Sequence, residues 1–260
     1  MRDTYSHGHH ESVLRSHRAR TAENSCAYLL PSLRQGMDLL DVGCGPGTIT
    51  VDLAARVAPG RVVGIDLVAA VDPAMTRDNV SFEVGDVYAL RFDDASFDVV
   101  HAHQVLQHLG RPIEALVEMR RVLRPGGVLA VRDSDYAGFI WAPADPLLDR
   151  WLELYHQITK RNGAEADAGR FLLGWVHAAG FIDVVATSST WTFADPSSRE
   201  WWGSMWADRV TQSGFGEQAL AYGLAGHDEL QAIAGAWRTW SDHPDAIFVV
   251  PHGEILATRG

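Results

Sequence analysis

The sequence predicts a doubly wound α/β fold, in which helices cover both faces of a largely parallel sheet. Short apolar runs alternate along the chain with stretches whose apolar residues recur at helical spacing. The first run ends in a glycine-rich turn, GCGPG at residues 43–47, which is typical of a buried strand that gives way to a helix. Strands joined through intervening helices run parallel, because each connection must cross over the sheet.

The first half of the chain supplies most of the expected strands. The first strand is followed by a helix over residues 49–57, which ends at Pro59-Gly60. A second helix is expected over residues 113–123, before the sequence RPGG. The strands themselves are expected at residues 37–42, 61–66, 80–84, 97–102 and 128–133.

The second half predicts two helices within residues 147–180, a strand over 181–192 and a final strand or hairpin over 246–258. Residues 195–245 show mixed polar and aromatic helical patterns without a strand signal, and they are too long for an ordinary connection. All nine tryptophans lie after position 140. We therefore expect a helical insertion before the last strand, with tryptophans as its core.

Composition and charge exclude several classes of function. The 22 Lys and Arg residues against 33 Asp and Glu give a net charge of −11, so the surface repels nucleic-acid phosphates and anionic lipid headgroups. No apolar stretch reaches the length of a membrane helix, and two cysteines make no disulfide framework. The polar start of the chain lacks the apolar core of a secretory signal. We expect a cytoplasmic protein with no nucleic-acid partner and no membrane span.

Polar and flexible residues gather at the carboxyl ends of the first three strands. The glycine-rich turn places backbone without side chains beside a helix N-terminus, where a polar ligand can approach closely. Asp66 ends the second strand, where it can accept hydrogen bonds from both hydroxyls of a ribose. Asp86 follows the third strand and can accept from an adenine amine. Because no lysine follows the glycines to hold a triphosphate, these groups describe a nucleoside amino acid ligand.

Five motifs follow one another in order over about a hundred residues: LLDVGCGPGT (39–48), VVGID (62–66), EVGDV (83–87), FDVVHAHQVLQHL (97–109) and RRVLRPGGVLAV (120–131). Together they resemble the class I S-adenosylmethionine-dependent methyltransferases, the broad family that includes the ubiquinone and menaquinone biosynthesis methyltransferases. The resemblance implies a Rossmann-like seven-stranded sheet with an antiparallel last hairpin. It also implies S-adenosylmethionine as the cofactor and S-adenosylhomocysteine as its product.

The resemblance assigns eight residues to the cofactor by their positions in the motifs. Cys44 is expected to be a packed side chain without chemistry of its own, because it lies between glycines with no base beside it in sequence. Gly43, Cys44 and Gly45 form the loop at the methionine part, Asp66 and Leu67 lie at the ribose, Asp86 and Val87 at the adenine, and Gln104 at the methionine end.

The residues that would serve the acceptor follow the fourth and fifth strands and the insertion. Methyl transfer is an in-line displacement, so the protein mainly aligns the acceptor, and a histidine can serve as a general base. His103 and His108 are the expected base or orienting groups, and His101 is expected to share with His103 a face toward the substrate. A small apolar or aromatic molecule, methylated on oxygen or carbon, is expected to contact Tyr136, Trp141, Trp202 and Trp206.

We expect a single methyltransferase domain over residues 1–260. It divides into an N-terminal flap (1–34), a cofactor-binding core (35–194 and 246–260) and a helical cap (195–245). Within the flap, Tyr5 to about Arg20 would pack over the cofactor, and a disordered tail is the alternative. No metal is expected, because neither the histidines at positions 7–10 nor His101 and His103 come with a third ligand at metal spacing.

Two other functions remain open at the level of sequence. A non-catalytic protein could bind S-adenosylmethionine with the same residues, because binding and turnover are separable. A nicotinamide-dependent oxidoreductase on a similar sheet is opposed by Thr48, which stands where the third glycine of G-x-G-x-x-G would fall. The expected partner is a small-molecule methyl acceptor, and the sequence leaves a homodimer open.

Overall fold

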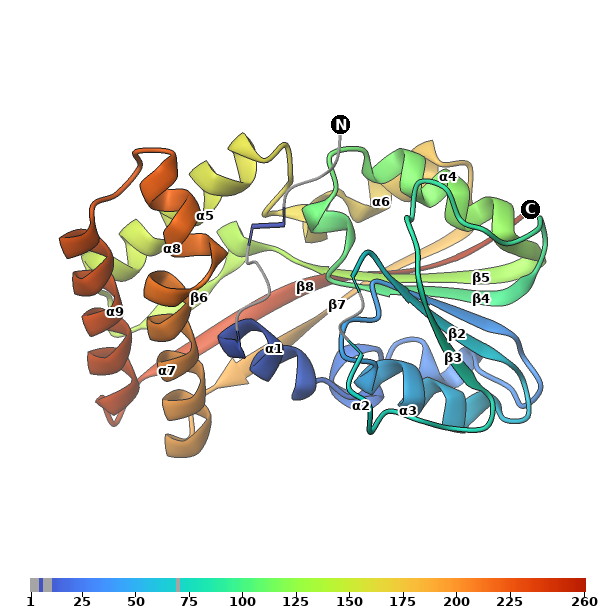
Figure 1. The fold of residues 1–260 in the computed structure, drawn as a ribbon, viewed down its shortest axis with the longest axis horizontal. Helices are drawn as coiled ribbons and strands as arrows, with labels where there is room; N and C mark the ends of the chain where they lie inside the picture. Colours follow the sequence, from blue (N-terminus) through green and yellow to red (C-terminus); the bar gives the residue numbers. More distant parts are fainter. Residues whose placement is uncertain (1–4, 7–10, 69–70) are drawn as a thin grey trace.

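The computed structural model describes residues 5–6, 11–68 and 71–260, and these form a twisted sheet with helices on both faces (Figure 1). Within these residues, seven strands pair in the order β3-β2-β1-β4-β5-β8-β6, and β7 pairs with β8 from the other side. Strands β1 to β5 run parallel, whereas β8 runs antiparallel to its neighbours. The strands are β1 (Leu39–Val42), β2 (Val62–Asp66), β3 (Val80–Val84), β4 (Phe97–His103), β5 (Leu123–Ser134), β6 (Ile140–Ala142), β7 (Ile182–Phe193) and β8 (Ile247–Thr258).

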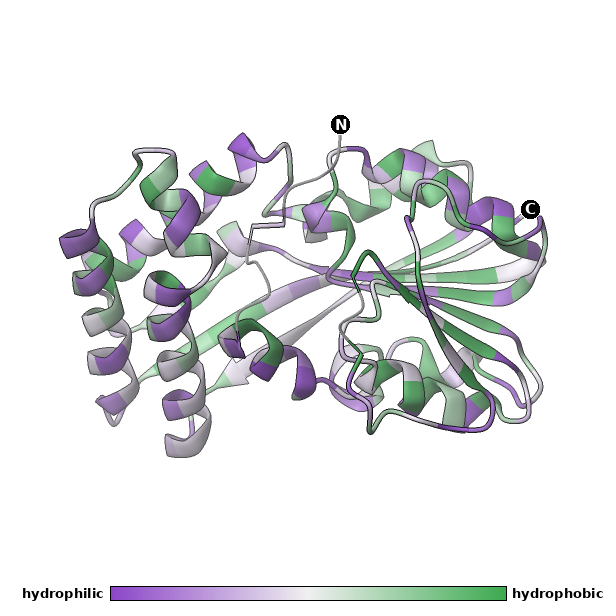
Figure 2. Ribbon diagram, in the orientation of Figure 1, coloured by the Kyte–Doolittle hydropathy of each residue, from purple (hydrophilic) through white to green (hydrophobic). Residues whose placement is uncertain are grey.

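Helices lie on both faces of the parallel strands, which confirms the doubly wound class. One layer contains α2 (Ala22–Ser25) and α3 (Thr48–Val57), and the opposite layer contains α4 (Pro112–Val122) and α6 (Ala168–Ala178). The short helix α1 (Glu11–Arg18) precedes them in the chain. Figure 2 shows hydrophobic residues concentrated along the central strands between the two layers.

Strand β1 is buried at every position, which explains its continuous apolar run. Leu39 pairs in register with Val62 of β2 and with Val99 of β4. Because side chains alternate along a strand, Leu39 packs against the layer of α3, whereas Leu40 and Val42 pack against the layer of α4. The parallel register brings the carboxyl ends of β1, β2 and β4 to one edge of the sheet.

A long antiparallel pair extends the sheet beyond its parallel part. β7 and β8 pair from Ile182 and Thr258 to Phe193 and Phe248, whereas β5 leaves β8 at Ser134. The chain between β7 and β8 folds into helices that pack against the extension, which confirms the predicted insertion. These helices are α7 (Pro196–Gln212), α8 (Gly214–Ala221) and α9 (His227–Asp242), and α5 (Pro146–Arg161) packs beside them.

The inserted helices enclose an aromatic core. Trp151 of α5 is fully buried, and its ring meets those of Trp206 and Trp237 edge-on at 4.5 and 4.9 Å.

The sheet of the described residues has eight strands, one more than the seven predicted, because Ile140–Ala142 form β6. This strand forms because β8 runs past the end of β5 and offers unpaired backbone groups there. Among the described helices, none has the length and apolar character needed to cross a membrane.

A buried ion pair joins β1 to β4 at the centre of the sheet. His101 Nδ1 lies 2.7 Å from Asp41 Oδ1, and Asp41 also accepts a hydrogen bond from the Thr50 hydroxyl at 2.6 Å. Burial by itself lowers the pKa of His101, but the hydrogen bond to Asp41 and the nearby Cys26 raise it to about 10. The expectation that His101 faces a substrate was wrong, because its ring is fully buried against Asp41.

We expect the Asp41–His101 pair to make the free energy of unfolding decrease as the pH becomes alkaline. Because the folded-state pKa of His101 exceeds its unfolded value of about 6.5, the stabilisation is complete below that value and is lost as pH rises toward about 10. Urea unfolding between pH 6 and 9.5 would show a decline of up to about 1.4 kcal/mol per pH unit. The double variant Asp41→Asn/His101→Gln should lack this part of the slope, and an identical slope in both proteins would contradict the assignment.

Candidate functional site

The glycine-rich loop after β1 adopts a conformation that requires glycine. Gly43 and Gly45 have φ values of 68° and 51°, in the left-handed region. A Cβ atom on Gly43 would lie 2.3 Å from Val105 Cγ2, so a side chain would also clash there. The loop therefore presents bare backbone at the N-terminus of α3.

Two carboxylates lie at the ends of the neighbouring strands. Asp66 accepts hydrogen bonds from the backbone N–H of Gly45 at 2.9 Å and of Val68 at 3.3 Å. Asp86 follows β3 and accepts from the N–H of Tyr88 at 2.9 Å. Asp66 thus fixes the glycine loop against the end of β2, and both carboxylates keep further acceptor sites.

A cavity at these strand ends, here called the loop cavity, is lined by the glycine loop, Asp66 and Asp86. The cysteine in the loop is buried, which raises the pKa of its thiol and fits the expectation that it has no chemistry of its own. All eight residues that the resemblance assigned to the cofactor line the loop cavity: Gly43, Cys44, Gly45, Asp66, Leu67, Asp86, Val87 and Gln104.

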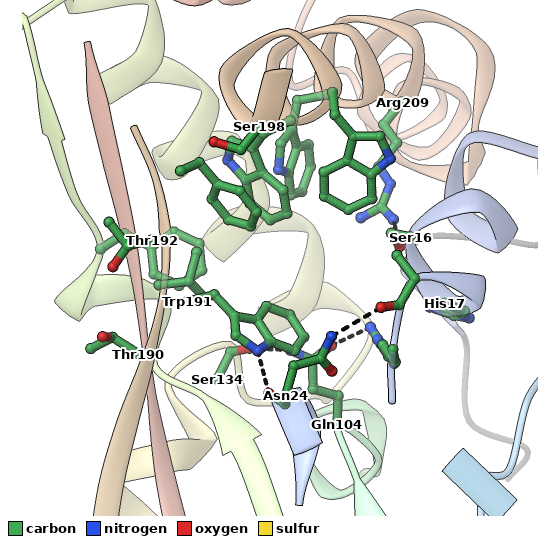
Figure 3. Close-up of a pocket in the computed structure, with 18 of the residues that line it drawn as sticks. Ser16, His17, Asn24, Gln104, Ser134, Thr190, Trp191, Thr192, Ser198 and Arg209 are labelled. Carbon is green, nitrogen blue, oxygen red and sulfur yellow. Dashed lines mark hydrogen bonds between the residues drawn. The ribbon is translucent and has the colours of Figure 1, made fainter. Parts of the chain in front are cut away.

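A second cavity of about 530 Å³, here called the tryptophan cavity, lies between the inserted helices and the strand ends (Figure 3). Its tryptophans are Trp191, Trp201, Trp202 and Trp206. Tyr136, Trp202 and Trp206, three of the four residues expected at the acceptor, line it. Trp141 does not, because it pairs with Phe248 across β6 and β8 and stacks on that ring at 5.7 Å.

The two cavities share a wall, at which Gln104 is central. The Gln104 side chain accepts a hydrogen bond from Arg20 at 2.5 Å and donates to the Ser134 hydroxyl at 2.7 Å. Its φ of 54° lies in the left-handed region, a strained conformation for this residue, and its N–H donates to Arg132 O at 2.7 Å. The residues that line both cavities are Tyr5, His17, Arg20, Gln104 and His108.

The two histidines predicted as bases have different surroundings. His103 lines only the loop cavity, and its ring is 4% exposed and lies 5.7 Å from that of Trp191. Burial, together with Arg20 and Arg132, lowers its pKa well below the usual value. His108 lines both cavities, and burial with the charges of Arg20 and Arg209 lowers its pKa to about 3.

The N-terminal segment contributes to the shared wall. The Tyr5 ring meets the His108 ring edge-on at 4.6 Å, and the Tyr5 carbonyl accepts a hydrogen bond from Gln218 of α8 at 3.2 Å. Helix α1 packs against α7, where Arg15 pairs with Asp208 at 3.5 Å.

The histidines at positions 7–10 lie outside the described residues. Among those described, no group of three or more His, Cys, Asp or Glu is arranged to hold a metal ion.

Two arginines of the cavity walls were not predicted as functional residues. Arg20 follows α1 and was expected only as the end of the flap over the cofactor, whereas Arg209 lies on α7, within the inserted helices. No local spacing marks either residue, because each reaches the site through packing between segments distant in sequence. The sequence places Asp208 directly before Arg209, which suggests a nearby carboxylate partner. In the structure, however, Asp208 pairs with Arg15.

The sequence also matches proteins of known family. Residues 33–180 match the methyltransferase domain family, which covers more than half of the chain. An uncharacterised methyltransferase of Schizosaccharomyces pombe is 32% identical over 97% of this chain and 95% of its own. A probable methyltransferase of Aspergillus luteorubrus is 30% identical over 99% of this chain and 98% of its own.

A solved structure shows the same fold. Phosphoethanolamine N-methyltransferase 2 of Haemonchus contortus, in complex with phosphomonomethylethanolamine and S-adenosylhomocysteine, superposes with a TM-score of 0.52. It is 16% identical, and the match covers 87% of this chain and 49% of that one. The family match, the two full-length relatives and the glycine loop with its two carboxylates agree with the resemblance in the motifs. The chain belongs to the class I S-adenosylmethionine-dependent methyltransferases.

Proposed function

We propose that this methyltransferase methylates a small, largely apolar or aromatic molecule on an oxygen or carbon atom, with the acceptor in the tryptophan cavity. One observation carries the proposal. The loop cavity and the tryptophan cavity share five lining residues, so a cofactor in the first and an acceptor in the second would meet at that wall. The volume of about 530 Å³ suits a small molecule.

The chemistry of the loop cavity fits S-adenosylmethionine. The free lone-pair sites of Asp66 would accept from the ribose hydroxyls, and Asp86 would accept from the adenine amine. The bare backbone of the glycine loop would admit the methionine part. At that end, the charge of Arg20 would complement the amino acid carboxylate, and Gln104 keeps Arg20 in place.

Methyl transfer then requires little of the chain beyond alignment and exclusion of water. When bound, the cofactor supplies an electrophilic methyl group on a positively charged sulfur. Trp202 and Trp206 would hold the apolar body of the acceptor, and Tyr5 would cover the wall at which the two ligands meet. Holding the reacting atoms in line is the largest contribution that such a site can make.

His108 suits the orienting role better than His103, because only His108 lines both cavities. With a pKa of about 3, His108 is uncharged at neutral pH and is a weak base, because a general base works best with a pKa near the working pH. Its Nε2 accepts a hydrogen bond from the Gln107 side-chain amide at 3.1 Å, which orients the ring and occupies the lone pair that a base would need.

Calorimetric titration with S-adenosylmethionine, S-adenosylhomocysteine and NAD tests the cofactor class. We expect saturable binding of the first two and none of NAD. A screen of aromatic hydroxyl and carbon-acid acceptors, read by the formation of S-adenosylhomocysteine, then tests turnover. Tight binding without turnover of any acceptor would favour the non-catalytic alternative, and binding of NAD alone would favour an oxidoreductase.

We expect Asp66→Ala to weaken S-adenosylhomocysteine binding. The variant leaves ribose hydroxyls without an acceptor and frees the N–H of Gly45, at a cost of about 1–3 kcal/mol, or roughly 5- to 150-fold in Kd. Asp78→Ala is the matched control, because Asp78 is exposed in the same β2–β3 connection and lines neither cavity. An unchanged Kd for Asp66→Ala would reject the placement of the ribose.

The pH dependence of turnover tests His108. Because its lowered pKa keeps His108 uncharged above about pH 3, we expect kcat/KM to show no ionisation near pH 6.5 and to stay level from about pH 5 to 8. His108→Gln removes an orienting contact, so we expect a smaller loss of kcat than the roughly 10²- to 10⁴-fold that removal of a general base would cause. The exposed His227 gives the control His227→Gln. A limb near pH 6.5 that disappears in His108→Gln would contradict the lowered pKa.

A further inference from the structure

A buried cation lines the tryptophan cavity and has no carboxylate partner within the part of the chain that the structure describes. Arg209, on α7, is 5% exposed, and its guanidinium lies 5.0 Å from the centre of the Trp206 ring. Figure 3 shows its side chain extending from α7 toward Ser16 among the residues of the cavity wall. A charged group in such surroundings needs compensation by an opposite charge or by a complete set of hydrogen bonds.

The described surroundings of Arg209 provide only part of this compensation. Nη2 donates to the Ser16 hydroxyl and approaches the Ser12 carbonyl at 3.5 Å. Nε finds no acceptor among the described residues. Asp208, its neighbour in sequence, pairs instead with Arg15. Among the described residues that line the tryptophan cavity, none is Asp or Glu.

The position of Arg209 separates it from the cofactor. Arg20 lines both cavities and donates to Gln104 at the shared wall, so its charge is available to the cofactor. Arg209 lines only the tryptophan cavity and not the loop cavity. An anionic group bound to Arg209 would therefore belong to the acceptor.

We propose that the acceptor is an aromatic acid, whose carboxylate is bound by Arg209 and whose ring is held by the neighbouring tryptophans. This inference rests on the proposed function, since it concerns the occupant of the same cavity. A carboxylate would supply the opposite charge that the Arg209 guanidinium lacks among the described residues, in a charge-assisted hydrogen bond, the strongest kind available to a guanidinium. The flat faces of Trp202 and Trp206 suit an aromatic ring better than a flexible chain.

The competing interpretation is that Arg209 only fastens α1 to α7 through Ser12 and Ser16. An anchor and a carboxylate ligand predict different binding behaviour. Loss of an anchor would weaken the binding of every acceptor alike, whereas loss of a carboxylate ligand would affect acids alone. Arg15→Gln is the matched control, because it removes the other charged link between α1 and α7.

The test compares acids with neutral amides of the same shape. Protein saturated with S-adenosylhomocysteine is titrated with 4-hydroxybenzoate and 4-hydroxybenzamide, and with indole-3-acetate and indole-3-acetamide. We expect the wild type to prefer at least one acid over its amide by about 10- to 100-fold. Arg209→Gln should abolish this preference and leave amide affinity unchanged, and Arg15→Gln should retain the preference.

A measurement on the wild type alone keeps the test decisive if Arg209→Gln does not fold. The affinity for the preferred acid should fall as ionic strength rises, whereas amide affinity should not. Equal affinity for acid and amide in both pairs, equal weakening of both by Arg209→Gln, or no binding of either acid at millimolar concentration would overturn the proposal. Any of these results with intact S-adenosylhomocysteine binding leaves the proposed function standing, whereas loss of that binding in the wild type would overturn the proposed function itself.

Discussion

The antiparallel pairing of β7 with β8 is the constraint on which the arrangement of both cavities depends. Only the carboxyl-terminal part of β8 pairs with β5, and the amino-terminal part of β7 pairs with this part of β8 on its other side. The other halves of β7 and β8 continue along the inserted helices. Where the parallel part ends, Arg132 of β5 pairs with Glu254 of β8 at 3.1 Å and donates to Ser189 of β7. One continuous ribbon therefore fixes the helical insertion relative to the strand ends, and the tryptophan cavity lies between them because the ribbon does not bend away.

Much of the fold and of the loop cavity could be predicted from the sequence because these features are local. A buried parallel strand needs a continuous apolar run, and the turn after β1 needs glycine where φ is positive. Asp66 and Asp86 follow their strands directly, and a parallel sheet brings such ends together whatever the loops do. The insertion was also predictable, because its length and its tryptophans are visible in the sequence alone.

The remaining features depend on contacts that periodicity does not encode. β6 forms because β8 extends beyond the end of β5. The pairing of β6 with β8 places Trp141 against Phe248 rather than at the tryptophan cavity. His101 and His103 do share a strand face, as alternation predicts, but Asp41 occupies the space in front of His101 alone. Arg209 shows the same principle at longer range, since its neighbours come from α1, nearly two hundred residues away in the chain.

The wall shared by the two cavities has a kinetic consequence. Tyr5, His17 and Arg20 come from the same N-terminal part of the chain, and all three line both cavities. With cofactor and acceptor placed as proposed, a change in the packing of these residues would alter the Michaelis constants for donor and acceptor together, so the two constants would not vary independently. Exchange of spent cofactor for fresh cofactor would also disturb the surface against which the acceptor rests. Steady-state kinetics of variants at these residues should therefore be interpreted as properties of the wall that the two cavities share, rather than of the binding of either substrate alone.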